Sequence, residues 1–310
     1  MVKSVTVEEL IQTLDINILH GEEFKTRKIS SSEVSRPGLI LTGYQDFYPH
    51  ERIQLIGRTE ISYINSKTSE ERTNIFNMLC HEETPAVVLS RDIDVPIELL
   101  PIAEVLGIPI LSSRSKTSRV LANLTNYLEA QLAERLSRHG VFVEVFGMGV
   151  LLTGASGVGK SETALELIQR GHRLIADDRV ELYMLDELTL IGEAPEILQN
   201  LLEIRGLGII DVMSLYGVAA IRRSQKLEVI IDLVIDDGTV EYDRLGSMRE
   251  FEQIFEVQTP KIRIPVKTGR NLSAIVESAA MNFRANEMGY NATDAFNKKL
   301  DDLIMKNRED

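Results

Sequence analysis

The chain has 310 residues, 44% hydrophobic and 26% charged, which is enough for two ordinary globular domains with substantial cores. Its 34 basic and 47 acidic side chains give a formal net charge of −13, which argues against a general nucleic-acid binder and against a polybasic membrane-surface protein. The single cysteine, Cys80, cannot form an internal disulfide, so we expect a reducing compartment.

The first ten residues contain no apolar core of signal-peptide length, and no window holds 18 uninterrupted apolar residues. We therefore expect a soluble, cytoplasmic protein that binds neither membranes nor nucleic acid. Cys80 lies in an apolar, helix-like stretch, and we expect a buried structural thiol rather than a catalytic one.

The first 130 residues alternate between helix-like and strand-like patterns. Helices are expected over residues 6–14, 69–80 and 98–107, the second of them capped by Ser69. Strands are expected over residues 38–43, 60–65, 86–90 and 108–113. This alternation predicts a parallel or mixed sheet, and we assign residues 1–130 to an N-terminal α/β domain without a recognisable ligand motif.

A long apolar pattern over residues 115–136 predicts a helix that leads into a second domain, residues 131–310. In that domain, strands are expected over residues 141–154 (split by two glycines), 173–185 and 226–235, and helices over 162–171, 273–288 and 293–306. The strand at 226–235 is apolar on both faces, which is typical of a central strand. The predicted fold class is α/β throughout.

The clearest motif in the chain is a phosphate-binding loop. Its residues are Gly154, Ala155, Ser156, Gly157, Val158, Gly159, Lys160 and Ser161, which fit the G-x-x-x-x-G-K-[ST] pattern in full. The motif follows an apolar strand and opens a helix, so backbone N–H groups can turn toward phosphate oxygens. Lys160 would then contact the β- and γ-phosphates, and the Ser161 hydroxyl would ligate Mg²⁺. The alternative is a flexible strand–helix turn.

The sequence also bears on the nucleotide and on the group that receives the phosphate. No guanine-specific Asn-Lys-x-Asp motif is present, which favours ATP. Asp177 and Asp178 are neighbours on an expected strand, so only one of them should face the phosphates. A carboxylate there would bind Mg²⁺ or accept a proton from an attacking hydroxyl, and the alternative is a solvated turn. His139 by itself is more typical of a structural or exposed histidine.

Three further segments carry charge beside glycine. The first comprises Leu202, Glu203, Ile204, Arg205, Gly206, Leu207, Gly208, Ile209, Ile210 and Asp211. A mobile loop that presents Glu203 to a metal and a β-bulge in a buried strand are equally good interpretations of it. The others are Arg244 within residues 242–246, and the segment Pro265, Val266, Lys267, Thr268, Gly269 and Arg270 before a helix. Their cations would suit a phosphate group, with ordinary surface charge as the alternative.

Together these segments resemble the motifs of the HPr kinase/phosphorylase family. The resemblance is strongest at residues 154–161, 176–181, 202–211, 242–246 and 265–271 and covers essentially the whole chain. It implies a C-terminal P-loop domain similar to the core of phosphoenolpyruvate carboxykinases. It also implies a bifunctional enzyme that phosphorylates a serine of the phosphocarrier protein HPr with ATP or pyrophosphate. The same enzyme would remove that phosphate with inorganic phosphate and release pyrophosphate. Family members form hexamers and control carbon catabolite repression.

The resemblance further implies roles for individual residues. Asp178 would take the serine proton in the forward reaction and return it in reverse, since one group must serve both directions. His139 would lie beside Asp178 and the phosphoryl group, and Lys160 and Arg244 would stabilise the charge of the transferring phosphoryl.

The metal and the two remaining segments also acquire roles by resemblance. Ser161 and Glu203 would hold Mg²⁺. The segment 202–211 would serve both reactions, and the segment 265–270 mainly phosphorolysis, which needs a place for the attacking phosphate.

Two other functions are compatible with the same P-loop. One is a small-molecule or carboxykinase-like P-loop kinase. The other is a nucleotide-gated binding module without transfer chemistry, in which Asp178 is only structural.

Overall fold

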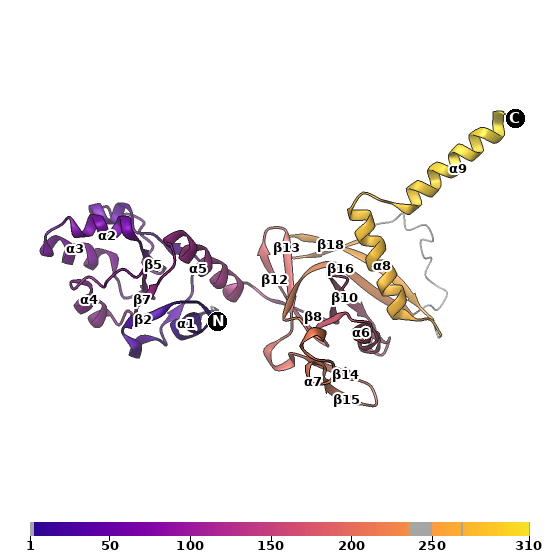
Figure 1. Cartoon of the computed structure of the whole chain (residues 1–310), viewed down its shortest axis with the longest axis horizontal. Helices are drawn as coiled ribbons and strands as arrows, with labels where there is room; N and C mark the ends of the chain where they lie inside the picture. Colours follow the sequence, from indigo (N-terminus) through magenta and orange to yellow (C-terminus); the bar gives the residue numbers. More distant parts are fainter. Residues whose placement is uncertain (1–2, 236–249, 268, 310) are drawn as a thin grey trace. The chain divides into compact units, whose positions relative to one another are not determined.

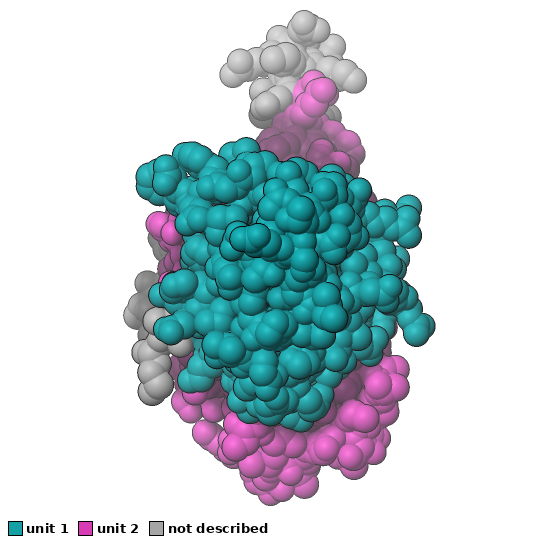
Figure 2. Space-filling view, turned by 90° about the vertical axis from the view of Figure 1, so that its left-hand side faces the viewer, with its two compact units in different colours: residues 1–133 teal, residues 134–310 magenta. Residues whose placement is uncertain are grey.

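The computed structural model describes residues 3–235, 250–267 and 269–309, with the backbone alone at residues 301 and 303–309. The chain divides into two compact units, Met1–Ala133 and Glu134–Asp310 (Figures 1 and 2). The expected boundary at residue 130 falls inside the helix α5 (Thr117–Leu132). Each unit is therefore one continuous stretch of chain, and the two are described separately.

The first unit is built around a sheet with the strand order β2-β7-β6-β5-β4. Strands β4 to β7 run parallel, and β2 is antiparallel to β7, so the sheet is mixed as predicted. The bounds are β2 (Asn17–His20), β4 (Val34–Ser35), β5 (Ile53–Ile56), β6 (Val87–Ser90) and β7 (Ile110–Ser113). Strands β1 (Val5–Thr6) and β3 (Lys28–Ile29) form a separate antiparallel pair.

Helices cover both faces of this sheet because successive strand residues point to opposite sides. Val87 and Leu89 of β6 share one core with α2 (Arg58–Asn65), α3 (Ser69–Leu79) and α4 (Leu99–Leu106). Val88 shares the core of the other face with α1 (Val7–Thr13) and α5. The helices expected over residues 6–14 and 98–107 are thus confirmed, with slightly shorter bounds.

The strand expected over residues 60–65 is wrong, because these residues belong to α2. The carboxylate of Glu60 accepts the N–H of Gly57 at 3.0 Å, which satisfies a free donor at the start of a helix. Ile61 and Ile64, three residues apart, then reach the same core. The apolar residues of this segment therefore follow the spacing of a helix rather than that of a strand.

Two other local predictions also differ from the structure. Residues 38–43 form not a strand but the 3₁₀ helix η2 (Leu39–Thr42), which ends at Gly43 with φ +97°. The α3 helix is capped by Thr68 rather than Ser69. The Thr68 hydroxyl accepts the N–H of Glu71 at 3.3 Å, and the Glu71 carboxylate accepts the N–H of Thr68 at 2.8 Å.

Cys80 is buried among the apolar side chains of α3 and its neighbours, as predicted. Burial raises the pKa of its thiol from the ordinary 9.0 to about 12. The thiolate is the species that attacks a disulfide reagent, so we expect the native thiol to react about a thousandfold more slowly than the unfolded one. Ellman's reagent at constant pH, with and without denaturant, measures both rates. Native and unfolded rates within about tenfold of each other would contradict the buried assignment.

The second unit contains a larger mixed sheet with the strand order β11-β9-β10-β16-β13-β12-β8, and β18 pairs with both β16 and β17. The bounds are β8 (Leu136–His139), β9 (Val141–Val145), β10 (Met148–Gly154), β11 (Arg173–Ala176), β12 (Arg179–Asp186), β13 (Thr189–Glu193), β16 (Ser224–Ile235), β17 (Glu250–Ile254) and β18 (Val257–Val266). Strand β16 is central, as its two apolar faces predict, and runs parallel to β10 and β18. A small hairpin, β14 (Leu201–Ile204) and β15 (Gly208–Asp211), stands apart.

Two predictions for the second unit differ from the structure. The helix expected over residues 115–136 ends at Leu132, because Leu136 enters β8 and pairs with Leu182 of β12. The strand expected over residues 173–185 is two strands, β11 and β12, separated by Asp177 and Asp178. Asp178 has φ +63°, a left-handed conformation that interrupts the extended chain.

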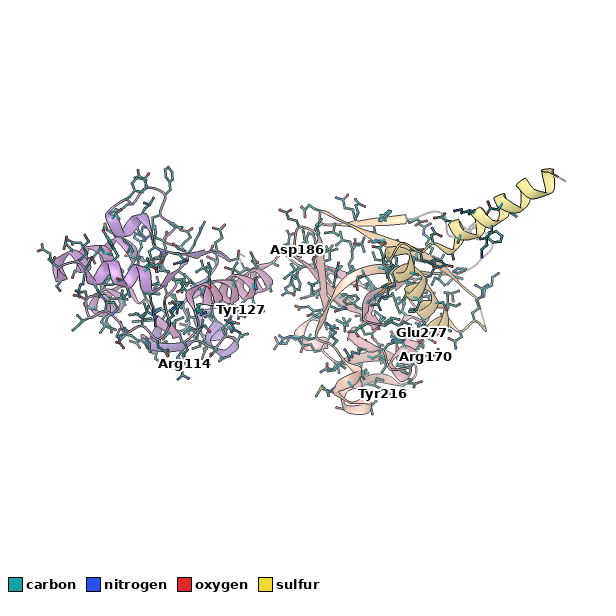
Figure 3. The ribbon with its side chains drawn as sticks, turned by 45° about the horizontal axis from the view of Figure 1, so that its top comes forward. Arg114, Tyr127, Arg170, Asp186, Tyr216 and Glu277 are labelled. Carbon is teal, nitrogen blue, oxygen red and sulfur yellow. The ribbon has the colours of Figure 1, made fainter. Side chains whose placement is uncertain are left out.

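The helices α6 (Lys160–Gln169) and α8 (Leu272–Glu287) share a core with β9, β10 and β16. Arg170 at the end of α6 and Glu277 of α8 lie near one another (Figure 3) and form an ion pair at 3.0 Å. His172 contacts the other carboxylate oxygen at 3.0 Å. The short helix η3 (Glu196–Leu198) precedes the hairpin, and α7 (Val212–Tyr216) and η4 (Val218–Ala220) follow it. The last helix is α9 (Ala292–Glu309). Within the described residues, no helix combines the length and apolar character needed to cross a membrane.

Gly149 of β10 packs closely against β16. A Cβ at this position would lie 2.0 Å from the backbone oxygen of Lys226 and 2.9 Å from the ring of Phe142. We expect Gly149→Ala to lower the free energy of unfolding by about 3 kcal/mol, because the two strands would have to separate. Denaturant unfolding measures the change.

Gly147→Ala is the matched comparison for this prediction. Gly147 has φ +85° but open space around the missing Cβ, so alanine should cost only about 1 kcal/mol of backbone strain. If the two variants lost equal amounts of unfolding free energy, a clash with the backbone oxygen of Lys226 would not explain the effect at position 149.

Candidate active site

The P-loop lies between β10 and α6, which is the strand–loop–helix arrangement that its motif requires. Gly154 ends β10 with φ +136°, and a Cβ there would lie 2.4 Å from the backbone oxygen of Leu233. Gly159 precedes α6 with φ +100°. These positions need glycine, because a side chain would be strained at both and would meet β16 at the first.

Lys160 is buried at the first residue of α6. Its ammonium donates to the carbonyl oxygens of Gly154 at 3.0 Å and Ala155 at 3.1 Å. The cation is thus held over the loop, at the positive end of the helix, where a phosphate group would gain from both.

Asp177 joins the P-loop to the β14–β15 hairpin. Its Oδ1 accepts the hydroxyl of Ser161 at 3.0 Å, and its Oδ2 accepts the N–H of Glu203 at 2.9 Å. Burial raises the pKa of Asp177 above its ordinary value, although these two hydrogen bonds oppose the rise. The sequence assigned no role to Asp177, and in the structure its carboxylate holds the Ser161 hydroxyl through a hydrogen bond.

Asp178 faces the same pocket, beside His139. His139 ends β8 opposite Arg179, and its Nδ1 lies 3.0 Å from Oδ1 of Asp178. Both side chains are more than half exposed, so a group from outside can reach the carboxylate. The expected strand through both aspartates is wrong, because the left-handed turn at Asp178 separates β11 from β12, and both Asp177 and Asp178 line the pocket.

The segment 202–211 is neither a bulge in a buried strand nor a single loop. It forms the β14–β15 hairpin, whose turn contains Gly206 at φ +86° and is followed by Gly208 at φ +93°, the first residue of β15. Arg205 at this turn lies against the P-loop, and its Nη1 is 3.0 Å from the position that a Cβ of Gly157 would occupy. Sequence reasoning included Arg205 in the 202–211 segment but gave it no role of its own.

These groups line one pocket of about 140 Å³. Its lining residues are His139, Val141, Ser156, Gly157, Gly159, Lys160, Ser161, Glu162, Asp177, Asp178, Glu203 and Arg205. The pocket therefore combines a phosphate-binding loop, an accessible carboxylate–histidine pair and a guanidinium. Such a set can bind a nucleotide's phosphates and move a proton beside them.

Of the remaining predicted site residues, those that the structure describes do not line this pocket. Arg244 and Thr268 lie outside the described residues. Pro265 and Val266 end β18, and Arg270 donates to the Pro265 oxygen at 3.4 Å, one residue before the Asn271 cap of α8. The described part of the segment 265–270 does not line the pocket.

The donors around Ser161 suit Mg²⁺ shared with a phosphate group. Among the described residues, no cluster of three or more His, Cys, Asp or Glu side chains could hold a metal ion by itself. Mg²⁺ in phosphoryl-transfer sites takes only one or two protein oxygens and completes its shell with phosphate and water. The Ser161 hydroxyl, with the oxygens of Asp177 and Glu203 in the same pocket, fits that pattern.

Comparison with known proteins identifies the family of the chain. The family models described as HPr Serine kinase N terminus and HPr Serine kinase C-terminal domain match residues 5–128 and 130–300. An HPr kinase/phosphorylase of Levilactobacillus brevis is 53% identical over 99% of both chains. One of Listeria monocytogenes is 51% identical over 99% of this chain and 98% of its own.

Among solved structures, the HPr(Ser) kinase/phosphatase of Coxiella burnetii matches with 35% identity and a TM-score of 0.48, over 52% of this chain and 98% of its own. The two family models together span nearly the whole chain, and the relatives match it from end to end. The chain belongs to the HPr kinase/phosphorylase family, as its motifs predict.

Proposed function

We propose that the protein phosphorylates a serine of HPr with ATP and removes that phosphate by phosphorolysis. One observation carries the proposal. A single pocket combines Lys160 and Ser161 of the P-loop with the exposed Asp178–His139 pair. A nucleotide phosphate on the loop and a hydroxyl from another protein can meet there, because the carboxylate is accessible from outside.

In the kinase direction, Asp178 accepts the proton of the serine hydroxyl as its oxygen attacks the γ-phosphorus. The bond to the β–γ bridging oxygen breaks, and ADP leaves. His139, 3.0 Å from the carboxylate, orients it toward the incoming hydroxyl. Lys160 offsets the negative charge that collects on the phosphoryl oxygens.

In the phosphorylase direction, an oxygen of inorganic phosphate attacks the phosphoserine. The bond between phosphorus and the serine oxygen breaks, and the protonated Asp178 returns its proton to that oxygen. Pyrophosphate is then the product, and pyrophosphate can serve in reverse as phosphate donor. Arg244 is proposed to stabilise the transferring phosphoryl together with Lys160, and the segment 265–270 to help bind the attacking phosphate.

The proposal includes the setting of the reaction. Mg²⁺, held by Ser161 and Glu203, would supply charge neutralisation on the nucleotide phosphates. The protein would act in the cytoplasm as a homohexamer and control carbon catabolite repression, without binding membranes or nucleic acid. Its C-terminal unit would share the core of phosphoenolpyruvate carboxykinases.

Incubation with HPr, labelled ATP and Mg²⁺ tests the proposal. We expect label on a serine of HPr, and release of labelled pyrophosphate when unlabelled phosphate is added. HPr with its acceptor serine replaced by alanine is the control and should take up no label. Transfer to a metabolite in preference to HPr would instead establish a small-molecule kinase, and binding of ATP without any transfer would establish a binding module.

A further inference from the structure

A second, larger cavity of about 410 Å³ lies in the C-terminal unit, away from the P-loop. Residues at the beginning of β10, β16 and β18 line it, whereas the P-loop starts at Gly154, the last residue of β10. Residues of α8 close one side, among them Phe283 and Arg284. Among the residues described, the two cavities share no lining residue. Its size is within the range of sites for small organic molecules.

The cavity wall contains a buried hydroxyl without a partner. Thr259 is 1% exposed, and its Oγ1 has no hydrogen-bond partner among the described residues. A buried hydroxyl in this state costs free energy, because it has lost its water without replacing it. A polar group of a bound molecule would restore the missing hydrogen bond.

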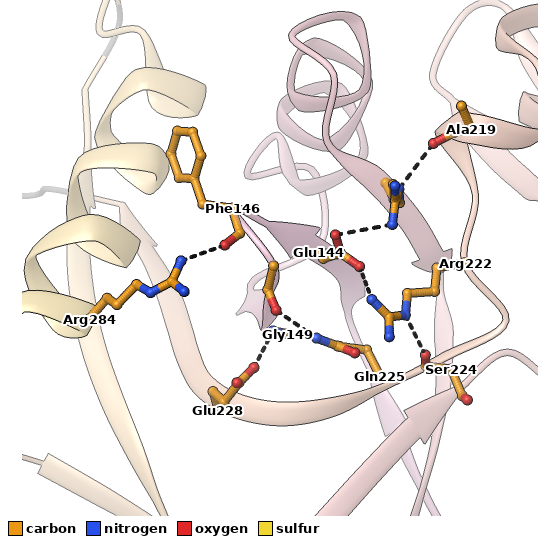
Figure 4. A network of polar contacts seen from close by, with 11 residues as sticks. Glu144, Phe146, Gly149, Ala219, Arg222, Ser224, Gln225, Glu228 and Arg284 are labelled. Carbon is orange, nitrogen blue, oxygen red and sulfur yellow. Dashed lines mark hydrogen bonds and ion pairs between the residues drawn. The ribbon is translucent and has the colours of Figure 1, made fainter. Parts of the chain in front are cut away.

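A carboxylate is brought to the same cavity by an irregularity in the sheet. Gly149 and Val150 of β10 pair with Leu227 and Val229 of β16, so Glu228 is an extra residue at a bulge. Its Oε2 accepts the N–H of Gly149 (Figure 4). Burial raises the pKa of Glu228, and the Gly149 N–H and the nearby cations oppose the rise. The second oxygen of this carboxylate remains available to a ligand.

Two cationic side chains lie near this carboxylate. Lys226 and Arg284 both line the cavity, and both act on the charge of Glu228. Arg284 donates from Nη1 to the backbone oxygen of Phe146 at 2.8 Å, which orients its guanidinium (Figure 4). The other guanidinium donors can bind an acceptor such as a carboxylate.

The rest of the wall includes a second carboxylate, Glu287, and the amide of Gln258. Its apolar residues include Leu227, Pro260 and Phe283. A molecule that fills the cavity therefore meets acidic groups, basic groups and an apolar surface together. A simple anion would face Glu228 and Glu287, and a simple cation would face Lys226 and Arg284.

We propose that this cavity binds a small zwitterion, namely a free α-amino acid with an apolar side chain. The ammonium group pairs with Glu228, and the carboxylate pairs with Arg284 and Lys226. The Thr259 hydroxyl bonds to one of these polar groups, and the side chain lies against Phe283 and Pro260. The site is separate from the proposed catalytic pocket, so its test does not depend on phosphate transfer.

Calorimetric titration of the full-length protein tests the proposal with leucine, methionine and phenylalanine as probes. We expect at least one of them to bind. Isopentylamine and 4-methylpentanoate each retain one charged group of leucine, so each should bind about tenfold more weakly than leucine or worse. If none of the three amino acids binds at about 10 mM, or if an amine or carboxylate alone binds as well, the proposal is overturned.

Two variants locate the site. Thr259→Val keeps the shape but removes the hydroxyl, and Glu228→Gln removes the charge; each should weaken amino-acid binding about tenfold. Thr259→Val should keep or raise the unfolding temperature, which separates loss of binding from loss of fold. Ser161→Ala, in the other pocket, should leave amino-acid binding unchanged. Full binding in both Thr259→Val and Glu228→Gln would place the ligand elsewhere.

Discussion

Replacing Asp178 with asparagine is expected to slow phosphate transfer to HPr by about a thousandfold, and phosphorolysis by a similar factor. Asparagine fills the same space and can still contact His139, but it cannot accept the serine proton or return it. Nucleotide affinity should stay within about threefold, because the side chain is largely exposed and bonds to His139 rather than to the P-loop. Single-turnover transfer in both directions and nucleotide titration provide the three measurements.

Asp186→Asn is the matched control for this substitution. It makes the same chemical change at the other end of β12, where the carboxylate accepts the N–H of Leu188 at 2.9 Å, and it should leave both rates unchanged. Retention of more than about a tenth of the activity by Asp178→Asn would contradict the base assignment. Loss in only one direction would contradict a single group that serves both.

Replacing Lys160 with alanine is expected to weaken nucleotide binding by about a hundredfold and to lower transfer by about a thousandfold. The ammonium is buried at the helix N-terminus and is held by two P-loop carbonyl oxygens. Its removal takes away both the charge that a phosphate meets and the contacts that shape the loop. Titration with a fluorescent nucleotide and the HPr assay measure the two effects.

Lys160→Met separates charge from volume in this prediction. Methionine fills much the same space without the charge, so it should behave like alanine. Lys298→Ala removes an exposed lysine from α9 and should change neither quantity. Unaltered nucleotide affinity in Lys160→Met would refute the phosphate-binding role of the loop lysine.

The P-loop could be predicted from the sequence because its chemistry is contiguous. Eight successive residues contain the glycines, the lysine and the hydroxyl, and a strand before and a helix after them set the geometry. The family and its activity followed from several such short motifs, and the comparisons confirm the family.

The rest of the site depends on contacts between distant segments. Asp177 reaches both Ser161 and the N–H of Glu203, which lie 16 and 26 residues away. Strand periodicity wrongly placed Asp177 and Asp178 on a strand, because it cannot anticipate a left-handed residue between two strands. His139 was expected after a helix, whereas pairing with β12 draws residues 136–139 into a strand. In each case a partner elsewhere in the chain overrode the local pattern.

The division after Ala133 also bears on how such a chain can change over evolutionary time. All the described residues that line the candidate active-site pocket belong to the second unit, and the chain passes from one unit to the other once. A gene fragment for residues 134–310 would therefore encode every described residue of this pocket. Recombination at one position, near residue 133, would change the N-terminal unit and leave those residues unaltered.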